Sequence, residues 1–415
     1  MTFEIAPHEV ISGCRSCGSN NLADVLDLGT TPLADRLLTE DTLDEQEFGC
    51  PLSVVFCEDC ALMQIRETVD PVILFGGDYP YYSSVSPALL KHFRESTEEI
   101  MTRRQLGADN LVIEIASNDG YLLKNYADKG IRILGIDPAS GPAEKAIEQG
   151  IDTRIEFFTL DYAKQLAREN YLADVVHANN VLAHVADTNG FVAGIAAILK
   201  DDGEAVIECP YLKPLIDECE FDTIYHQHLC YFALTSLDAL FRRHGLYLNR
   251  VVLTSIHGGS LRLFLEKTER QEASVLDALA AERQSGMTTT AYYAAFADRV
   301  HSLAKSLRHI LDEIHDRAET IAGYGAAAKA CTLMSYVGID DRYLDYIADR
   351  STFKQGRYMT GNHLPIVPPE RILSDMPDYV LILPWNFVDE IVEQQSEYRS
   401  GGGKFIVPVP KPGII

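Results

Sequence analysis

The sequence predicts an α/β protein with three parts: a small cysteine-rich module, a doubly wound Rossmann-like sheet and a second Rossmann-like sheet. Two observations predict this architecture. Two pairs of closely spaced cysteines lie near the N-terminus, and an alternation of apolar strands, small-residue turns and helical patterns runs twice through the remaining chain. Since 415 residues exceed one ordinary domain, we expect the module over 1–75, the first sheet over 76–270, and a helical connector with the second sheet over 271–415.

The N-terminal module carries two CxxC pairs, CRSC (Cys14 and Cys17) and CEDC (Cys57 and Cys60), separated by 39 residues. Two such turns can aim four soft thiolates at one point, which is the ligand set of tetrahedral Zn²⁺. An odd total of nine cysteines favours metal ligation over disulfides in a reducing compartment. A redox CxxC needs only one pair, and four unrelated buried cysteines would not repeat the spacing. We therefore expect a zinc-binding module whose ion is structural, because four thiolates leave no position for water.

The first sheet begins with LVIEIASNDGYLL, in which an apolar strand over 111–115 precedes a small-residue turn, Ala116–Gly120, that opens a helix. RILGIDPAS gives a second strand ending in Asp137, and ADVVHANNVLAHV gives a third ending near Asn180. The ligand of such a sheet lies across the carboxyl ends of its strands. Asp137 lies 23 residues beyond Glu114, and it could accept hydrogen bonds from ribose hydroxyls.

The end of the first sheet is predicted to be antiparallel. GEAVIECPYL is a further strand, and after a helix over about 236–244 two consecutive strands, LYLNRVVLTS and GGSLRLFLEK, favour a closing hairpin. Between GEAVIECPYL and this helix, the stretch IYHQHLCYF (residues 224–232) fits no strand pattern, because its polar side chains fall on both faces. We expect this cluster to line a site.

The third part repeats the strand-turn-helix pattern after helical segments over 273–318. ETIAGYGAAAK carries GxGxxA at Gly323, Gly325 and Ala328, a turn whose backbone could approach a phosphate at a helix N-terminus. A close-packed turn without a ligand is the alternative. Lys329, and Lys354 with Arg357 in FKQGRY, offer local cations that either contact a ligand or are only solvated.

Composition excludes several classes of partner. The net charge of −25 argues against nucleic acid, since no basic excess exists to release counterions. No run of about 18 apolar residues predicts a membrane span, and MTFEIAPHEV lacks the basic start and apolar core of a signal peptide. We therefore expect a cytoplasmic protein without membrane contact.

Taken together, the four-cysteine module, EIASNDG with its downstream Asp, YHQH, HGGS, GYGAAAK and the final DYVLILPWNF with GGGKFIVPVP resemble one family over nearly the whole chain. It is the deoxysugar C-methyltransferases, which use S-adenosylmethionine to act on nucleotide-linked 4-ketosugars. The resemblance implies a class I methyltransferase sheet, structural Zn²⁺, a nucleotide-linked sugar substrate with dTDP as its carrier, and a place in deoxysugar and antibiotic biosynthesis.

The resemblance also implies roles for residues of this chain. The first turn and the following acidic residue would hold S-adenosylmethionine, through Glu114, Ala116, Asn118, Gly120 and Asp137. Residues near the reacting centre would be Asn180, His184, Tyr79 from GDYPYYSS, Tyr225, Gln227 and His228. The sugar diphosphate would be held by Tyr324, Lys329 and Arg357.

Two positions depart from the family pattern. Ala116 replaces the usual glycine of the first turn, which narrows the space beside the cofactor. Gln227 stands where relatives commonly carry a glutamate, and an amide can orient a neighbour by hydrogen bonding but cannot take a proton.

Methylating carbon next to a ketone requires a base that removes the α proton and a donor that stabilises the enolate oxygen. We expect His228 to be the base, since an imidazole is mostly neutral yet basic near pH 7. Tyr225 or Tyr79 is expected to donate to the oxygen. His226 would share a face with His228 if the backbone is extended, and would then orient it.

Two competing interpretations remain at this point. A nicotinamide-dependent nucleotide-sugar oxidoreductase would use GYGAAA as its dinucleotide turn and Asp349 as its ribose acid, but it leaves the better-formed EIASNDG turn without a ligand. A non-catalytic zinc scaffold is supported only by Gln227.

Overall fold

The computed structural model of the chain describes residues 3–75, 82–85 and 87–415. In the N-terminal module, β4 pairs antiparallel with β3 and β5 and parallel with β1, while β2 pairs with β6. The first CxxC pair precedes β3 and the second joins β4 to β5. The strands are β1 (Glu4–Ile5), β2 (His8–Val10), β3 (Leu22–Pro32), β4 (Phe48–Cys57), β5 (Met63–Ile65) and β6 (Glu67–Val69), followed by α1 (Pro71–Phe75) and the short 3-10 helix η2 (Ser83–Val85).

The first Rossmann-like sheet has the order β13-β14-β11-β10-β7-β8-β9. Strands β7 to β11 run parallel, whereas β14 is antiparallel to both β11 and β13, so the predicted closing hairpin is confirmed. The strands are β7 (Leu111–Ile115), β8 (Arg132–Ile136), β9 (Thr153–Arg154), β10 (Ala173–Asn179), β11 (Leu199–Pro210), β13 (Tyr247–Thr254) and β14 (Ser260–Glu266).

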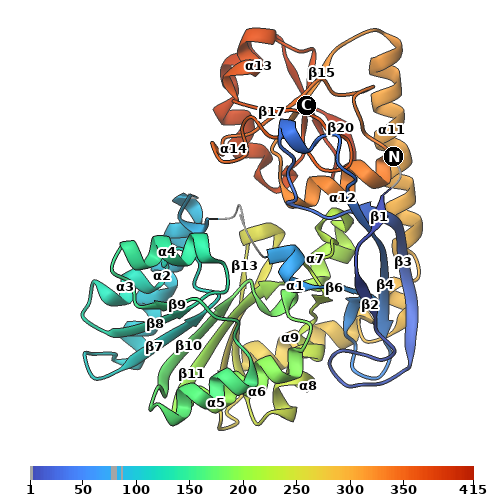
Figure 1. Cartoon of the computed structure of the whole chain (residues 1–415). Coiled ribbons are helices and arrows are strands. Elements are labelled where there is room, and N and C mark those ends of the chain that lie inside the picture. Colours follow the sequence, from blue (N-terminus) through green and yellow to red (C-terminus); the bar gives the residue numbers. More distant parts are fainter. Residues whose placement is uncertain (1–2, 76–81, 86) are drawn as a thin grey trace.

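Helices cover both faces of this sheet, as a doubly wound fold requires. Figure 1 shows α2, α3 and α4 over one face and α5, α6 and α8 over the other. Their bounds are α2 (Pro87–Arg104), α3 (Leu123–Ala127), α4 (Ser140–Glu148), α5 (Leu160–Arg168), α6 (Thr188–Ile198) and α8 (Leu234–Arg243), and α7 (Leu212–Asp217) follows β11. All five residues of β7 are buried, which explains why this central strand is continuously apolar except for Glu114.

The C-terminal sheet has the order β17-β16-β15-β18-β19-β20, with only β20 antiparallel to its neighbour in the described chain. The strands are β15 (Ile321–Tyr324), β16 (Ile347–Ala348), β17 (Ile366–Val367), β18 (Tyr379–Ile382), β19 (Lys404–Val407) and β20 (Gly413–Ile414). The helices are α12 (Ala328–Val337), α13 (Glu370–Asp375), α14 (Val388–Gln394) and α15 (Ser396–Ser400).

The connector consists of α9 (Ala273–Ser285), α10 (Thr290–Tyr293) and α11 (Phe296–Asp316). The long helix α11 contacts both β3 and α12, so it runs beside the N-terminal module and reaches the C-terminal sheet (Figure 1). No helix within the described residues is both long and apolar enough to cross a membrane.

The stretch 224–232 leads away from the first Rossmann-like sheet after the short 3-10 helix η4 (Phe221–Thr223). Its residues 225–228 form a tight turn, closed by the His228 amide donating to the Tyr225 carbonyl over 2.8 Å. The next residues form β12 (Cys230–Tyr231), which adds antiparallel to β5 of the N-terminal module. The extended backbone considered for this stretch is therefore wrong over 225–228, because the turn is needed to redirect the chain between two sheets.

The three parts of the chain also contact one another directly. Leu38 of the N-terminal module and Tyr358 of the C-terminal part exchange two backbone hydrogen bonds of 2.9 Å. The Thr332 hydroxyl of α12 donates to the Ile224 carbonyl over 2.7 Å. The pairing of β12 with β5 and the contact from Thr332 thus bring both flanking parts to the segment that carries the polar cluster.

Candidate functional site

The two CxxC turns have the same backbone geometry. The Gly18 amide donates to the Cys14 carbonyl over 2.8 Å, and the Ala61 amide donates to the Cys57 carbonyl over 2.9 Å. Gly18 (φ 75°) and Ala61 (φ 60°) both adopt the left-handed conformation that closes each turn. Each turn therefore presents its two sulfurs in the same direction.

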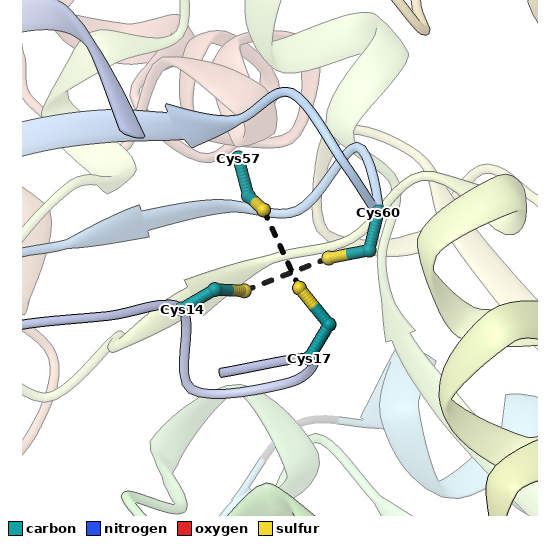
Figure 2. Close-up of side chains that lie close together, drawn as sticks. All are labelled: Cys14, Cys17, Cys57 and Cys60. Atoms are coloured by element: carbon teal, nitrogen blue, oxygen red, sulfur yellow. Dashed lines mark hydrogen bonds between the residues drawn. The ribbon is translucent and has the colours of Figure 1, made fainter. Parts of the chain in front are cut away.

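The four sulfurs of Cys14, Cys17, Cys57 and Cys60 all lie within 4.8 Å of one another (Figure 2). Cys14 and Cys60 approach to 3.5 Å, as do Cys17 and Cys57, and every cysteine of the chain is free of disulfides. Zinc–sulfur bonds of about 2.3 Å place tetrahedral sulfurs about 3.8 Å apart, so the cluster fits zinc. The hydrogen bond from Cys60 lowers the pKa of Cys14 to about 4. Among the described residues this is the only such group of metal-ligating side chains.

The first CxxC turn is docked on the helices of the first Rossmann-like sheet. The Arg15 carbonyl accepts from the Thr188 hydroxyl (3.1 Å) and the Asn189 amide (2.8 Å), and the Ser16 carbonyl accepts from Arg243 (2.9 Å). The zinc-binding turn is therefore fixed to α6 and α8 by hydrogen bonds to its backbone.

The turn after β7 is bent by left-handed residues, with Ala116 at φ 57°, Asn118 at φ 49° and Gly120 at φ 78°. The Asp137 carboxylate accepts from the amides of Asn118 and Ala139, each over 2.8 Å. Burial raises the pKa of Asp137. The carboxylate therefore shapes the turn, and the remaining lone pairs of its two oxygens are available to a ligand.

Buried polar atoms without hydrogen-bond partners among the described residues gather at the carboxyl ends of β7 and β10. They are both carboxylate oxygens of Glu114, Ser117 Oγ, Asp119 Oδ1, Asn179 Nδ2 and Asn180 Oδ1. Burial, with the charges of Asp137 and Asp119, raises the pKa of Glu114 well above its usual value. Because buried polar groups are normally paired, this cluster fits a polar cofactor such as S-adenosylmethionine.

The segment after the N-terminal module crosses the same turn. The amides of Ser83 and Ser84 donate to the side chains of Asn118 (2.9 Å) and Asp119 (3.3 Å). Tyr79, the tyrosine expected to reach the site from this segment, lies outside the described residues.

His228 and Tyr225 form a hydrogen-bonded pair within the tight turn. His228 Nδ1 lies 2.8 Å from the Thr223 carbonyl, which can only accept, so this nitrogen carries the proton. In the neutral ring Nε2 is then the acceptor, and the Tyr225 hydroxyl donates to it over 3.0 Å. The geometry therefore selects the tautomer whose basic nitrogen faces the phenol.

His184 lies beside this pair. Its ring centroid is 4.7 Å from that of His228, in an edge-to-face arrangement. It ends the 3-10 helix η3 (Leu182–His184) just after Asn180, whose backbone is left-handed (φ 53°) and whose amide donates to the Glu208 carbonyl over 2.7 Å. Burial lowers the pKa of His184 to about 4, so its ring is neutral at pH 7. The structure thus brings together Asn180, His184, Tyr225 and His228.

His226 and Gln227 occupy the middle of the turn and are both almost fully buried. His226 Nε2 donates to the Pro51 carbonyl of β4 over 2.9 Å, and burial lowers the pKa of this histidine. The side-chain nitrogen of Gln227 has no hydrogen-bond partner among the described residues.

The turn after β15 repeats the design of the turn after β7. The amides of Ala116 and Gly325 each donate over 2.7 Å to the carbonyl that ends the neighbouring strand. Asp349 accepts from the amides of Ala326 and Ser351, each over 2.7 Å, as Asp137 does in the first sheet. A Cβ atom at Gly325 would lie 2.4 Å from Pro384, so only glycine fits.

The three residues expected to hold a diphosphate all lie near this turn or in the loop after β16. Lys329 donates to Asn386 and lies 3.9 Å from the centre of the Trp385 ring. The Tyr324 hydroxyl donates to Gln394 over 3.4 Å, and Arg357 stacks on Phe353 at 4.0 Å. The Lys329 ammonium thus has protein partners already, and burial lowers its pKa.

Two acidic residues where the first Rossmann-like part meets Trp385 of the C-terminal part were not identified as site residues from the sequence. Asp222 is fully buried and accepts from Trp385 Nε1 over 2.7 Å, while Glu220 is only 6% exposed. Burial and the Asp222 charge raise the pKa of Glu220 to about 8. Their closeness in sequence to YHQH was the one available signal, but it did not reveal that they are buried.

Comparison with known proteins divides the chain into three matched segments. Residues 14–75 match the family model described as “Putative zinc binding domain”, 90–251 match “Methyltransferase domain”, and 255–410 match “C-methyltransferase C-terminal domain”. The matches follow the order of the cysteine module, the first sheet and the second sheet.

Individual proteins resemble the chain to different extents. C-methyltransferase NovU of Streptomyces niveus is 35% identical over 408 residues, which cover 98% of this chain and 97% of NovU. Ubiquinone biosynthesis O-methyltransferase of Salmonella paratyphi A is 24% identical over 31% of this chain and 51% of its own length. The crystal structure of magnesium protoporphyrin IX methyltransferase from Synechocystis with bound SAH is 14% identical, covers 42% of this chain and 81% of its own, and has a TM-score of 0.35.

Proposed function

The chain belongs to the S-adenosylmethionine-dependent C-methyltransferases, and on that premise we propose that it methylates a nucleotide-linked 4-keto-deoxysugar at a carbon next to the ketone. The expected carrier nucleotide is dTDP, and the expected setting is deoxysugar and antibiotic biosynthesis in the reducing cytoplasm, where free thiols persist. The observation that carries the proposal is the hydrogen-bonded pair of His228 and Tyr225 beside His184.

His228 acts as the base in this proposal. Its Nδ1 proton is held by the Thr223 carbonyl, so the lone pair of Nε2 is the one that removes the α proton of the ketosugar. The C–H electron pair becomes the carbon–carbon double bond of an enolate, the negative charge moves to the ketone oxygen, and His228, which has taken the proton, becomes an imidazolium. The Thr223 carbonyl favours that charged form, because the hydrogen bond that it accepts from Nδ1 becomes stronger when the ring is positive.

Tyr225 stabilises the oxygen that becomes negative. Without substrate its hydroxyl donates to His228 Nε2 over 3.0 Å. When a ketone is present the hydroxyl turns to the ketone oxygen, which frees Nε2 to meet the α proton. Tyr79 is the alternative donor. His184, neutral at pH 7, packs edge-to-face on His228, and Asn180 lies just before the 3-10 helix that ends in His184. Gln227 helps to orient the turn but takes no proton.

S-adenosylmethionine, when bound, supplies the electrophilic methyl group to the enolate carbon. Glu114, Ala116, Asn118, Gly120 and Asp137 would hold it, with Asp137 accepting from the ribose hydroxyls. The buried oxygens of Glu114, which have no hydrogen-bond partner in the part of the chain that the structure describes, support this placement. The four cysteines would hold a structural Zn²⁺ that takes no part in the chemistry.

The C-terminal sheet would hold the nucleotide diphosphate at the turn after β15. The proposed contacts are Tyr324, Lys329 and Arg357. Local cations are needed there because the chain as a whole carries a charge of −25, which repels a diphosphate. In this proposal residues 1–75 are the zinc-binding module, 76–270 bind S-adenosylmethionine, and 271–415 are the connector and the part that binds the nucleotide-linked sugar. The two Rossmann-like sheets face the substrate from opposite sides.

The test is a screen of nucleotide-linked 4-ketosugars with S-adenosylmethionine carrying a ¹³C-labelled methyl group. We expect one substrate to gain a carbon-bound methyl next to the ketone, detected by NMR. Incubation with NAD and NADP alone is the control, because turnover there would favour a nicotinamide-dependent oxidoreductase. A labelled methyl on oxygen or nitrogen, or no transfer to any ketosugar, would overturn the proposed reaction.

A further inference from the structure

The turn that carries Tyr225 and His228 belongs by sequence to the part with the first Rossmann-like sheet, yet it is fastened to the N-terminal module. Beyond the turn, β12 pairs with β5, with Cys230 opposite Gln64 and Tyr231 opposite Met63. The Ile65 amide donates to the Leu229 carbonyl over 3.0 Å, so the pairing continues to the residue after His228.

The strands that receive the turn are the ones that carry the second zinc-binding pair. Cys57 is the last residue of β4, and β5 begins three residues after Cys60. The Cys57 amide donates to the Leu62 carbonyl over 2.8 Å, which closes the loop between β4 and β5 around the sulfurs. The position of β5 therefore follows from the geometry of the metal site.

His226 makes the contact on the other side of the turn. It is only 1% exposed, and its Nε2 donates to the Pro51 carbonyl of β4 over 2.9 Å. A carbonyl can only accept, so Nε2 carries the proton, and Nδ1 has no hydrogen-bond partner within the described part of the chain. One nitrogen of this ring therefore matters for the contact and the other does not.

We propose that His226 is a positioning residue that, through Pro51, ties the turn carrying Tyr225 and His228 to the zinc-bearing strands and so sets the geometry of that pair. The proposal rests on the proposed function, because it assigns His226 a role in the proton transfer made by His228. The module's part in the enzyme is then to place the catalytic turn, in addition to holding the fold together.

A matched pair of amide substitutions tests the tie. The side-chain nitrogen of glutamine can occupy the place of Nε2, whereas that of asparagine reaches only the place of Nδ1. His226→Gln should therefore keep the hydrogen bond to Pro51, and His226→Asn should lose it. His226→Met, which fills the space without any donor, is the second variant that lacks the bond.

Three quantities are compared: kcat for methyl transfer, the affinity for S-adenosylhomocysteine, and hydrogen–deuterium exchange of the backbone over 223–231. We expect His226→Asn and His226→Met to lower kcat about 10- to 100-fold, because misplacement of a catalytic group by about 1 Å can cost about 100-fold. The amides of His228 and Leu229 should exchange faster in both. S-adenosylhomocysteine affinity should stay unchanged, and His226→Gln should match the natural protein in all three.

Equal behaviour of the glutamine and asparagine variants would overturn the proposal, and so would a loss of cofactor affinity in parallel with the loss of kcat, which indicates general destabilisation. The proposed function fails separately, if the natural protein methylates no ketosugar. The exchange comparison needs no substrate, so it decides the tie in either case.

Discussion

Replacing Asp137 by alanine tests which of the two equivalent turns holds the cofactor. In this chain Asp137 and Asp349 have the same local role, since each carboxylate accepts two backbone amides at 2.7–2.8 Å beside the first turn of its sheet. Asp349→Ala is therefore a matched control that creates the same defect in the other sheet. Asp137→Ala should lose about 2 to 6 kcal/mol of stability, for two buried donors left without acceptors, and Asp349→Ala should lose less, because its two hydrogen bonds are only partly buried.

The two variants should differ in cofactor affinity. A hydrogen bond to a charged group is worth about 1.5 to 3 kcal/mol, so Asp137→Ala should raise the dissociation constant of S-adenosylhomocysteine about 10- to 150-fold. Asp349→Ala should leave it unchanged. Isothermal titration calorimetry measures both constants, after thermal melts have confirmed that each variant is folded at the working temperature.

Opposite behaviour would refute this reasoning. If Asp349→Ala weakened S-adenosylhomocysteine binding and Asp137→Ala did not, the nucleoside would bind the C-terminal sheet. If neither variant changed the affinity, the ribose would have to be held away from both carboxylates.

The remaining predictions concern the metal, pH and the turn. Elemental analysis should find about one zinc per chain, and Cys57→Ser should lower both zinc content and melting temperature; a metal-free chain with unchanged melting would contradict the structural role. Burial lowers the pKa of His177 to about 3 in the folded chain, whereas an unfolded histidine has a pKa of about 6.5. As the pH falls, this histidine therefore becomes protonated in the unfolded chain before it does so in the folded chain. The free energy of unfolding should be unaffected by this histidine above pH 6.5 and should fall by about 1.4 kcal/mol per pH unit between pH 6.5 and pH 3. In urea denaturation at several pH values His177→Gln should flatten this slope, and an unchanged slope would contradict the role given to His177. Gln227→Glu should keep or raise kcat, because a carboxylate would favour the His228 imidazolium; activity reduced to background would contradict it.

The strands of the first sheet could be predicted because burial on both faces leaves a continuous apolar run. LVIEI marks β7 at the residues that the structure gives, and RILGI marks β8. The small-residue turn between them is where the left-handed backbone occurs, at Ala116, Asn118 and Gly120. The cysteine spacing likewise predicted that four sulfurs meet.

Contacts between distant segments could not be predicted in this way. Strand β12 has two residues, too few for a periodic pattern, and its partner β5 lies in another part of the chain. The direction of the YHQH side chains depends on that pairing, so the turn and the contact of His226 with Pro51 stayed hidden. Lys329 could be placed on a helix but not against Trp385, because helical position alone does not say which side chains cover it. The roles assigned to individual site residues stay predictions.

The proton transfer assigned to His228 is tested most directly by deuterium exchange at the carbon next to the ketone. The ketosugar found in the substrate screen is incubated in deuterated water with S-adenosylhomocysteine, and loss of the α proton is followed by NMR. The natural protein should catalyse exchange, and His228→Asn should abolish both exchange and methyl transfer while still binding S-adenosylhomocysteine. Exchange retained by His228→Asn but lost in His226→Asn would interchange the two histidines, and loss in Tyr225→Phe alone would mean that a phenolate or a bound water is the base.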